Sequence, residues 1–268
     1  MSEISPFGWW QRFLNLPKDS LAKTLIVAFT VALISAIVVS VTSVALRPLQ
    51  QANLDRQRQA RMEEMIANLP GMGELVREVG GDSLEIALVD INKGTFTSAV
   101  DPANYDQRDA AINPDQSVAL LPEDDIAGLG RRANYAPVYI LRRDDELALI
   151  LLPVHGVGYQ STLYGFLALE GNLTTVAGLT FYEQGETPGL GSRIEEASWE
   201  ALWPGTEIAD PDGVIRIEVV RGQASEPYQV DGISGATRTG NGVTNLLQFW
   251  LGDKGFGPFL AKLKSGGV

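Results

Sequence analysis

An uncharged run of 23 residues close to the N-terminus, from Thr24 to Leu46, constrains the fold of this chain more than any other feature. At about 1.5 Å per residue, a helix over this run matches a hydrocarbon core roughly 30 Å thick. We therefore predict one transmembrane helix at residues 24–46. A cleaved signal peptide is the alternative, although its apolar part is usually only about 7 to 15 residues long.

The residues that flank this run leave its orientation open. Residues 1–23 form an N-terminal tail, which we expect in the cytoplasm. Basic residues lie on both sides of the run: Arg12, Lys18 and Lys23 before it, and Arg47, Arg56, Arg58 and Arg61 after it. The positive-inside rule alone therefore does not decide the topology. Long domains translocate largely regardless of charge, so an arrangement with the N-terminus inside and the bulk of the chain outside is permitted.

The remainder of the chain has the composition of a folded, acidic domain. Residues 47–70 are typical of a juxtamembrane helix that ends at Pro70 and Gly71, and residues 71–268 form the main domain. From Met62 onward there are 14 basic and 30 acidic side chains. A protein that binds nucleic acid collects Lys and Arg instead, so we expect no nucleic-acid partner. The chain has no cysteine, which excludes disulfides and cysteine-ligated metal clusters.

The apolar pattern of the main domain predicts an α+β fold. Short runs rich in Ile, Val, Leu and Tyr, separated by Asp, Gly and Pro, are typical of strands. They lie at residues 83–91, 136–144, 146–154, 162–171, 174–183 and 213–222. Ser192 is followed three residues later by Glu195, and this capping-box pattern predicts a helix over residues 192–205. We expect a mixed domain with a mainly antiparallel sheet and flanking helices.

The segment DGISGATRTGNG, residues 231–242, precedes an amphipathic helix. Gly252 is placed to end that helix, which we expect to begin between Thr239 and Asn241. Apolar residues recur at helical spacing along it: Val243, Leu246, Leu247, Trp250 and Leu251. The first turn of such a helix presents unpaired N–H groups and a partial positive charge, which suit a phosphate group.

Small and hydroxylated residues surround the predicted start of this helix. The small ones, which leave room for a ligand, are Gly235, Ala236, Gly240 and Gly242, and the added hydroxyl donors are Ser234, Thr237 and Thr239. An ordinary N-cap turn is the alternative, because Ser, Thr, Asn and Gly are common there. The segment matches neither of the usual glycine-rich nucleotide motifs, so these residues alone leave both interpretations open.

Four motifs follow one another along the chain: LRPLQQANLDRQ after the apolar run, STLYGFLAL at residues 161–169, GETPGLG at residues 185–191, and DGISGATRTGNGVTNLLQFWLGDKGFGPFL at residues 231–260. In this order they resemble the covalent FMN-binding subunit of the bacterial sodium-translocating NADH:quinone oxidoreductase. The resemblance implies an FMN-binding domain. It also implies that FMN is bound covalently, by a phosphoester to the last Thr of the pattern D-G-x-S-G-A-T-x-T, which is Thr239 here.

The resemblance also assigns roles to other residues. It implies that the phosphate and ribityl chain are lined by Ser234, Gly235, Ala236 and Thr237, and that the isoalloxazine ring is contacted by Glu186, Thr187, Leu190 and Gly191. Arg221 stands where the family tends to have a lysine near the flavin, and a cation there favours reduced, anionic flavin. Asp231 resembles the acid that a separate flavin-attaching transferase requires. Without the resemblance, these positions are a Pro-Gly turn, a surface arginine and a turn or cap residue.

The chain departs from the family's pattern at three places. Gly158, Tyr159 and Gln160 stand where the family usually has Leu-Trp, so either Tyr159 supplies the aromatic wall beside the flavin or that wall is missing. Arg238 replaces a commonly apolar residue, and Gly240 replaces a common serine. Neither change removes the hydroxyl that would accept the flavin.

Other candidate sites are weaker. His155 is the only histidine, so neither a catalytic triad nor a multi-histidine metal site is available without it, and we expect it in a surface loop. The acidic clusters at residues 123–125 and 144–146 lack the spacing of a calcium loop and are expected to be solvated turns. We therefore predict no metal site and no catalytic residue in this chain.

The resemblance implies an electron carrier in a translocating oxidoreductase of the bacterial inner membrane. Its partners would be the other subunits of the complex, the flavin-attaching transferase and the membrane, with a single pass and the bulk of the chain on the periplasmic side. In the family, electrons pass from NADH to ubiquinone and drive sodium transport. Two alternatives remain: the FMN-carrying subunit of the related ferredoxin:NAD oxidoreductase complex, whose flavin is also tethered, and a non-redox envelope adaptor with a single span.

Overall fold

The computed structural model describes residues 21–68, 85–102, 105–143 and 146–267, with only the backbone described for residues 22 and 48–68. The chain divides into two compact units, Met1–Gln57 and Arg58–Val268. Residues 1–20 of the tail predicted at 1–23, the Pro70-Gly71 stop and the start of the first predicted strand at residues 83–84 lie outside the described residues. So do two acidic residues of the cluster at 144–146.

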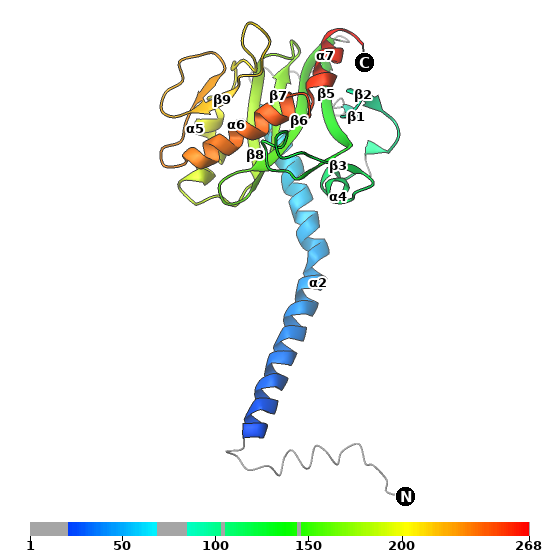
Figure 1. Cartoon of the computed structure of the whole chain (residues 1–268), viewed down its shortest axis with the longest axis vertical. Coiled ribbons are helices and arrows are strands. Elements are labelled where there is room, and N and C mark those ends of the chain that lie inside the picture. Colours follow the sequence, from blue (N-terminus) through cyan, green and yellow to red (C-terminus); the bar gives the residue numbers. More distant parts are fainter. Residues whose placement is uncertain (1–20, 69–84, 103–104, 144–145, 268) are drawn as a thin grey trace, which may run out of the picture. The chain divides into compact units, whose positions relative to one another are not determined.

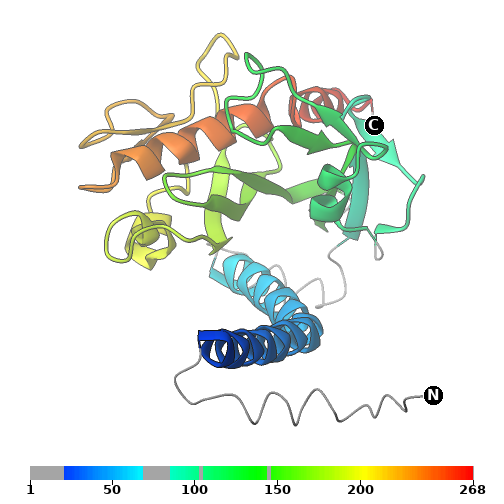
Figure 2. The same ribbon diagram turned by 60° about the horizontal axis from the view of Figure 1, so that its bottom comes forward.

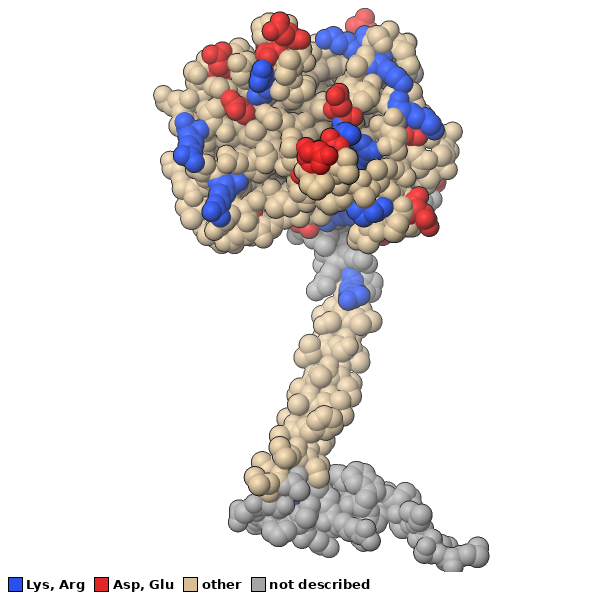
Figure 3. Space-filling model, in the orientation of Figure 1, with Lys and Arg blue, Asp and Glu red and all other residues tan. Residues whose placement is uncertain are grey.

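Helix α2 spans Leu21–Asn68 without interruption, so the predicted transmembrane segment and residues 47–68 of the predicted juxtamembrane segment lie in one continuous helix. Its part from Lys23 to Arg47 is long and apolar enough to cross a membrane, by length and composition. The large apolar side chains of this part are exposed, and most of its length in Figure 3 carries neither acidic nor basic side chains. An exposed apolar surface of this length needs a nonpolar environment.

A six-stranded sheet forms the centre of the second unit (Figure 1). Its strand order is β2-β1-β5-β6-β7-β8, and every neighbouring pair is antiparallel. The strands are β1 (Glu85–Asp90), β2 (Thr95–Thr97), β5 (Tyr135–Arg143), β6 (Glu146–Val157), β7 (Thr162–Glu170) and β8 (Val176–Glu183). The predicted α+β class with a mainly antiparallel sheet is confirmed.

Shorter elements surround the sheet. Strands β3 (Ser117–Ala119) and β4 (Arg131–Ala133) form an antiparallel pair, and β9 (Glu218–Val220) pairs in parallel with β10 (Gln229–Asp231). The helices are α4 (Gln107–Ile112), the 3₁₀ helix η2 (Gly191–Glu195), α5 (Ala197–Glu200), α6 (Thr237–Leu251) and α7 (Gly257–Lys264). Strand β10 leads through a short loop into α6, so the DGISGATRTGNG segment connects the small parallel pair to the long helix.

Helix α6 lies across one face of the sheet (Figures 1 and 2). The predicted apolar face is confirmed, since its residues are fully buried or nearly so: Val243, Leu246, Leu247, Trp250 and Leu251. Burial of each such side chain stabilises the fold by roughly 1.5 to 3 kcal/mol. The indole N–H of Trp250 also donates to the carbonyl oxygen of His155 at 2.7 Å. This packing holds the helix, and with it the first turn, in one place on the sheet.

The second turn of α6 approaches the end of β6 very closely. A Cβ at Gly242 would lie 2.7 Å from the carbonyl oxygen of Val157 and 2.8 Å from the Cα of Gly158. Only glycine permits this distance between helix and strand. The start of α6 is therefore held next to the loop that follows β6.

Three sequence predictions are wrong in detail. Residues 192–205 do not form one helix, because η2 and α5 are separated at Glu196, which is extended. The hydroxyl of Ser192 accepts from the N–H of Gly189 at 3.0 Å and caps no helix. Trp199 and Trp203, which follow the break, are buried, so tertiary packing overrides the local pattern.

The second wrong prediction is the strand at 213–222, of which only Glu218–Val220 is regular strand.

The third wrong prediction is the position of His155, which lies in β6 and not in a surface loop. Its ring stacks on Tyr164 at a centroid distance of 5.4 Å and contacts the ring of Trp250 at 4.9 Å. Burial, with a smaller contribution from the charge of Arg108, lowers the pKa of His155 to about 4.

Candidate functional site

A tight turn immediately precedes α6. The N–H of Ala236 donates to the carbonyl oxygen of Ile233 at 3.0 Å, and Gly235 between them has a φ of 81°. A positive φ at this position is readily adopted only by glycine. A Cβ there would also lie 3.0 Å from the side chain of Leu190. The glycine thus lets the chain turn close to the loop that carries Leu190.

Helix α6 begins at Thr237, two residues before the earliest predicted start. Its N-cap is Ala236, whose side chain has no acceptor, and no side chain among the described residues caps the first turn. The N–H groups of the first turn and the helix dipole are therefore available to an anion, which gains roughly 0.3 to 1 kcal/mol from the dipole. Phosphate is the common ligand of such a helix start.

A cavity of about 310 Å³ opens beside this first turn, and we call it the threonine cavity. Two loops and the helix start form its walls. The lining residues are Tyr159, Glu186, Thr187, Leu190, Gly191, Gly235, Ala236, Thr237, Arg238 and Thr239. Nine of the eleven cofactor-binding residues named from the sequence thus lie around one space, although they come from three separate parts of the chain.

Thr239 lies at the inner end of this arrangement. It is only 2% exposed, and its hydroxyl donates a hydrogen bond of 2.6 Å to Oε2 of Glu186. A Cβ at Gly191 would lie 2.5 Å from Oγ1 of Thr239 and 2.8 Å from Cβ of Glu186. The glycine of the GETPGLG loop therefore makes room for this pair.

The carboxylate of Glu186 is held by the loop that follows β6. Oε1 accepts hydrogen bonds from the backbone N–H groups of Tyr159, Gln160 and Ser161, at 3.1, 2.9 and 3.1 Å, and from the hydroxyl of Ser161 at 3.2 Å. Burial alone would raise the pKa of Glu186. The hydrogen bonds from Thr239 and these three N–H groups outweigh it and hold the pKa below its ordinary value. Glu186 is thus an ionised carboxylate with its second oxygen directed at Thr239.

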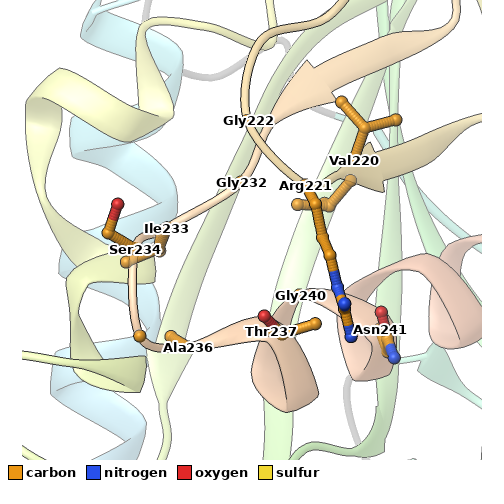
Figure 4. A pocket seen from close by; sticks show the side chains of 12 residues that line it. Val220, Arg221, Gly222, Gly232, Ile233, Ser234, Ala236, Thr237, Gly240 and Asn241 are labelled. Carbon is orange, nitrogen blue, oxygen red and sulfur yellow. The ribbon is translucent and has the colours of Figure 1, made fainter.

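A second cavity of about 210 Å³, which we call the arginine cavity, adjoins the first. The two cavities share Gly235, Ala236 and Thr237. Arg221 and Ser234, the remaining two cofactor-binding residues named from the sequence, line only the arginine cavity. Figure 4 shows the side chain of Arg221 extending toward Asn241 and the first turn of α6. The guanidinium group therefore adds positive charge near the helix start.

Asp231 lines neither cavity. Its carboxylate accepts a hydrogen bond of 2.6 Å from the N–H of Ala224, and its carbonyl oxygen accepts from the indole N–H of Trp199 at 3.0 Å. These contacts hold the loop between β9 and β10 and the end of β10. In this structure Asp231 shapes the approach to α6 without facing the space beside Thr239.

Several residues of the site were not assigned from the sequence. Arg238 lines the threonine cavity, and its guanidinium carbon lies 5.0 Å from the centre of the Tyr159 ring, which is half exposed. Asn241 lines the arginine cavity, and Ser161 bonds to Glu186. The charge of Arg238 between two threonines was a usable signal. The backbone N–H groups of the 159–161 loop give no sequence signal, because any residue type except proline provides them.

These residues fit a flavin mononucleotide. The uncapped helix start and Arg221 suit its phosphate, and the close approaches at Gly191 and Gly235 make space that a Cβ would fill. Tyr159 and Leu190 offer apolar surface at the mouth of the cavity. A buried hydroxyl at the same point can accept a phosphoryl group.

Comparisons with known proteins agree with this fit. A family model described as FMN-binding domain matches residues 158–252. Two relatives are Na(+)-translocating NADH-quinone reductase subunits of the NqrC type, and each is 44% identical. The one from Vibrio alginolyticus matches over 92% of this chain and 97% of its own length, and the one from Pseudomonas aeruginosa over 93% and 98%.

Two solved structures are also similar. The crystal structure of Shewanella oneidensis NqrC aligns with a TM-score of 0.66 and 36% identity, covering 70% of this chain and 88% of that one. The crystal structure of the corresponding Na(+)-translocating NADH-quinone reductase subunit from Parabacteroides distasonis aligns with a TM-score of 0.54 and 25% identity, covering 82% and 96%.

Proposed function

The chain belongs to the NqrC family of Na(+)-translocating NADH-quinone reductase subunits, and from this premise we propose that it carries FMN on Thr239 through a phosphoester bond. It is an electron-carrier subunit of that oxidoreductase complex, and its cofactor is FMN. Relatives that match along nearly the whole chain favour NqrC over the FMN-carrying subunit of the ferredoxin-dependent complex and over a non-redox adaptor.

The single observation that carries the attachment site is the position of Thr239. Its hydroxyl is buried at the inner end of the threonine cavity, within the first turn of α6, where unpaired N–H groups favour a phosphate. Thr237 lies in the same turn and lines both cavities, but among the described residues only the hydroxyl of Thr239 has a carboxylate acceptor there.

When bound, FMN supplies reversible electron transfer. We assign the protein the tasks of holding and tuning. The turn from Ser234 to Thr237 and the uncapped N–H groups hold the phosphate. The positive charge of Arg221 favours the reduced, anionic flavin, because opposite charges attract. The GETPGLG loop and Tyr159 line the space where the ring system would lie.

We also propose the placement that the resemblance implies. Residues 24–46 cross the inner membrane once, residues 1–23 stay in the cytoplasm, and residues 47–70 lead to an FMN-binding domain, residues 71–268, on the periplasmic side. A separate flavin-attaching transferase recognises the segment that begins at Asp231 and adds the flavin. The other subunits of the complex supply and remove the electrons.

Peptide mass mapping of the full chain, coexpressed with a flavin-attaching transferase, tests the attachment. We expect an FMN-sized adduct on the peptide that contains Thr239, and a fluorescent band after denaturing electrophoresis. Thr239→Ala should lose both signals, whereas the matched control Thr237→Ala should keep the adduct. An unmodified Thr239, or an adduct on Thr237, would overturn the proposal.

The absence of cysteine provides a clean test of topology. A single cysteine placed at Ser2 or at the exposed Asp212 is the sole thiol in the chain. We expect a membrane-impermeant maleimide to label intact spheroplasts only when the cysteine is at position 212. Labelling of position 2 alone would show the opposite orientation.

A further inference from the structure

A phosphoester can form on Thr239 only if its hydroxyl loses a proton, and the structure places one proton acceptor against it. Oε2 of Glu186 lies 2.6 Å from Oγ1 of Thr239, and both residues are almost fully buried. The two residues are 53 positions apart in the sequence. The sequence assigned Glu186 a contact with the flavin ring, but the structure directs its carboxylate at the oxygen that would be esterified.

We propose that Glu186 is the general base for flavin attachment, accepting the proton of Thr239 as the bond from Oγ1 to phosphorus forms. This inference rests on the proposed function. It adds that the protein which receives the flavin supplies part of the chemistry of its own modification, while the transferase supplies the flavin donor.

The other residues around the threonine cavity cannot take this role. Among the described residues that line it, Glu186 is the only carboxylate. The guanidinium group of Arg238 has only hydrogen-bond donors, and the hydroxyls of Thr187, Thr237 and Tyr159 are far weaker bases than a carboxylate at neutral pH. The acceptor can therefore be identified by elimination as well as by distance.

The geometry of Glu186 divides its two oxygens between two tasks. The three N–H groups of residues 159–161 bond Oε1, which fixes the carboxylate, and the N–H of Tyr159 also reaches Oε2 at 3.2 Å. Oε2 is thereby held toward Thr239. The low pKa of the carboxylate keeps it unprotonated at neutral pH. A carboxylate that takes a hydroxyl proton late in phosphoryl transfer has a known counterpart in the catalytic aspartate of protein kinases.

The proposed step balances with a named co-reactant. The donor is a flavin dinucleotide, in which the FMN phosphate is joined through an anhydride to a nucleoside monophosphate. The O–H bond of Thr239 breaks and its proton passes to Oε2 of Glu186, while Oγ1 forms the bond to phosphorus. The anhydride bond breaks, and the nucleoside monophosphate leaves with the bonding electrons. Nothing is oxidised or reduced.

Glu186→Gln tests this role with little change in shape. A glutamine can keep its carbonyl oxygen at the N–H groups of residues 159–161, but its NH₂ group then faces Thr239 and accepts no proton. The matched control is Glu196→Gln, the same exchange at an exposed carboxylate that lines neither cavity. The purified full chain without flavin is mixed with the transferase and flavin adenine dinucleotide, and covalent flavin is followed by in-gel fluorescence and mass spectrometry.

We expect Glu186→Gln to slow attachment by about 10² to 10⁴, the usual contribution of a general base, and Glu196→Gln to stay within about threefold of the unaltered chain. The slow reaction of Glu186→Gln should accelerate by up to about tenfold per pH unit relative to the unaltered chain, because hydroxide must replace the missing base. The other titratable or charged groups lining the cavity, Arg238 and Tyr159, are present in both proteins. A merely structural defect would not create this pH dependence.

Glu186→Asp keeps the charge and should react at least about tenfold faster than Glu186→Gln. Rates are referred to the folded fraction of each variant, measured by thermal unfolding. Attachment to Glu186→Gln within about threefold of the unaltered chain, or equal rates for the two variants, would overturn the role of Glu186 while leaving Thr239 as the site. Absence of any adduct in the unaltered chain would instead overturn the proposed function.

Discussion

Gly242→Ala is expected to push α6 away from the end of β6 and so to shift the residues that position Glu186 and Thr239. The added methyl group would lie 2.7 Å from the carbonyl oxygen of Val157 and 2.8 Å from the Cα of Gly158. Both atoms belong to the backbone, so no side-chain rotation relieves the contact. The loop that starts at Gly158 continues into the N–H groups that hold Glu186, and a shift there would loosen the Glu186–Thr239 hydrogen bond.

The size of the effect follows from two opposing terms. Alanine in place of glycine inside a helix stabilises it by roughly 1 kcal/mol. Overpacking costs about 1 to 3 kcal/mol, and contact with two backbone atoms places this case at the upper end. We therefore expect a net loss of about 2 kcal/mol, which lowers the Tm of a domain of this size by about 4 to 8 °C.

Gly240→Ala is the matched control, because it lies in the same helix. Its Cβ would meet only the side chain of Val219, at 3.2 Å and 3.7 Å, and a small rotation of that side chain relieves the contact. The two variants are compared by thermal unfolding of the full chain in detergent, followed by tryptophan fluorescence, before flavin attachment. We expect Gly240→Ala to unfold at or above the Tm of the unaltered chain. Equal Tm values for the two variants would refute the close-approach argument.

Three further predictions concern single groups. His155, the only histidine, should show no titration in its NMR signals between about pH 8 and pH 5, because its pKa is lowered to about 4. The unfolded chain takes up this proton first, so the stability that depends on neutral His155 is lost as the pH falls from about 6.5 toward 4. An NMR titration midpoint near 6.5 would contradict the buried position. The stability that ionised Glu186 contributes should be fully present above its ordinary pKa of 4.5 and lost as the pH falls through its lower folded-state pKa. The difference in unfolding free energy between the unaltered chain and Glu186→Gln should therefore be constant at neutral pH and shrink only in acid. Thr239→Ala should bind free FMN no tighter than about 1 μM in a fluorescence titration, because the carboxylate of Glu186 remains beside the phosphate position, and nanomolar binding would contradict this electrostatic argument.

The parts of the fold that could be predicted from the sequence are those with a long, regular pattern. The apolar run at 24–46 and the face of α6 from Val243 to Leu251 each repeat a signal over many residues, and both lie where predicted. Strands β2, β3, β4, β9 and β10 have three residues each, too few for a period to emerge. The helix predicted from Ser192 failed because the burial of two tryptophans outweighs a capping pattern worth about 1 kcal/mol.

The candidate site, like the fold, could be predicted only where a local sequence pattern or a known family motif marks its residues. The helix start and its hydroxyls could be read from DGISGATRTGNG, and the resemblance to a known family added the GETPGLG loop. The hydrogen bond from Thr239 to Glu186 could not be predicted, because the two residues are 53 positions apart in the sequence. The carboxylate is also held in place by backbone donors of a third segment. The contact among the 159–161 loop, the GETPGLG loop and the start of α6 depends on how α6 packs on the sheet. No local sequence pattern predicts such a contact.

The position of Glu186 explains why a covalent bond would be useful at this site. A carboxylate 2.6 Å from the acceptor oxygen repels a phosphate, and the helix dipole contributes only about 0.3 to 1 kcal/mol in the opposite direction. The acidic excess of the domain, 30 acidic against 14 basic side chains from Met62 onward, adds to the repulsion. Arg221 and Arg238 offset part of it from the rims of the two cavities. A site that keeps a negative charge beside its ligand's phosphate is better suited to making a bond than to holding a free ligand, and the bond then retains the cofactor where noncovalent binding would be weak.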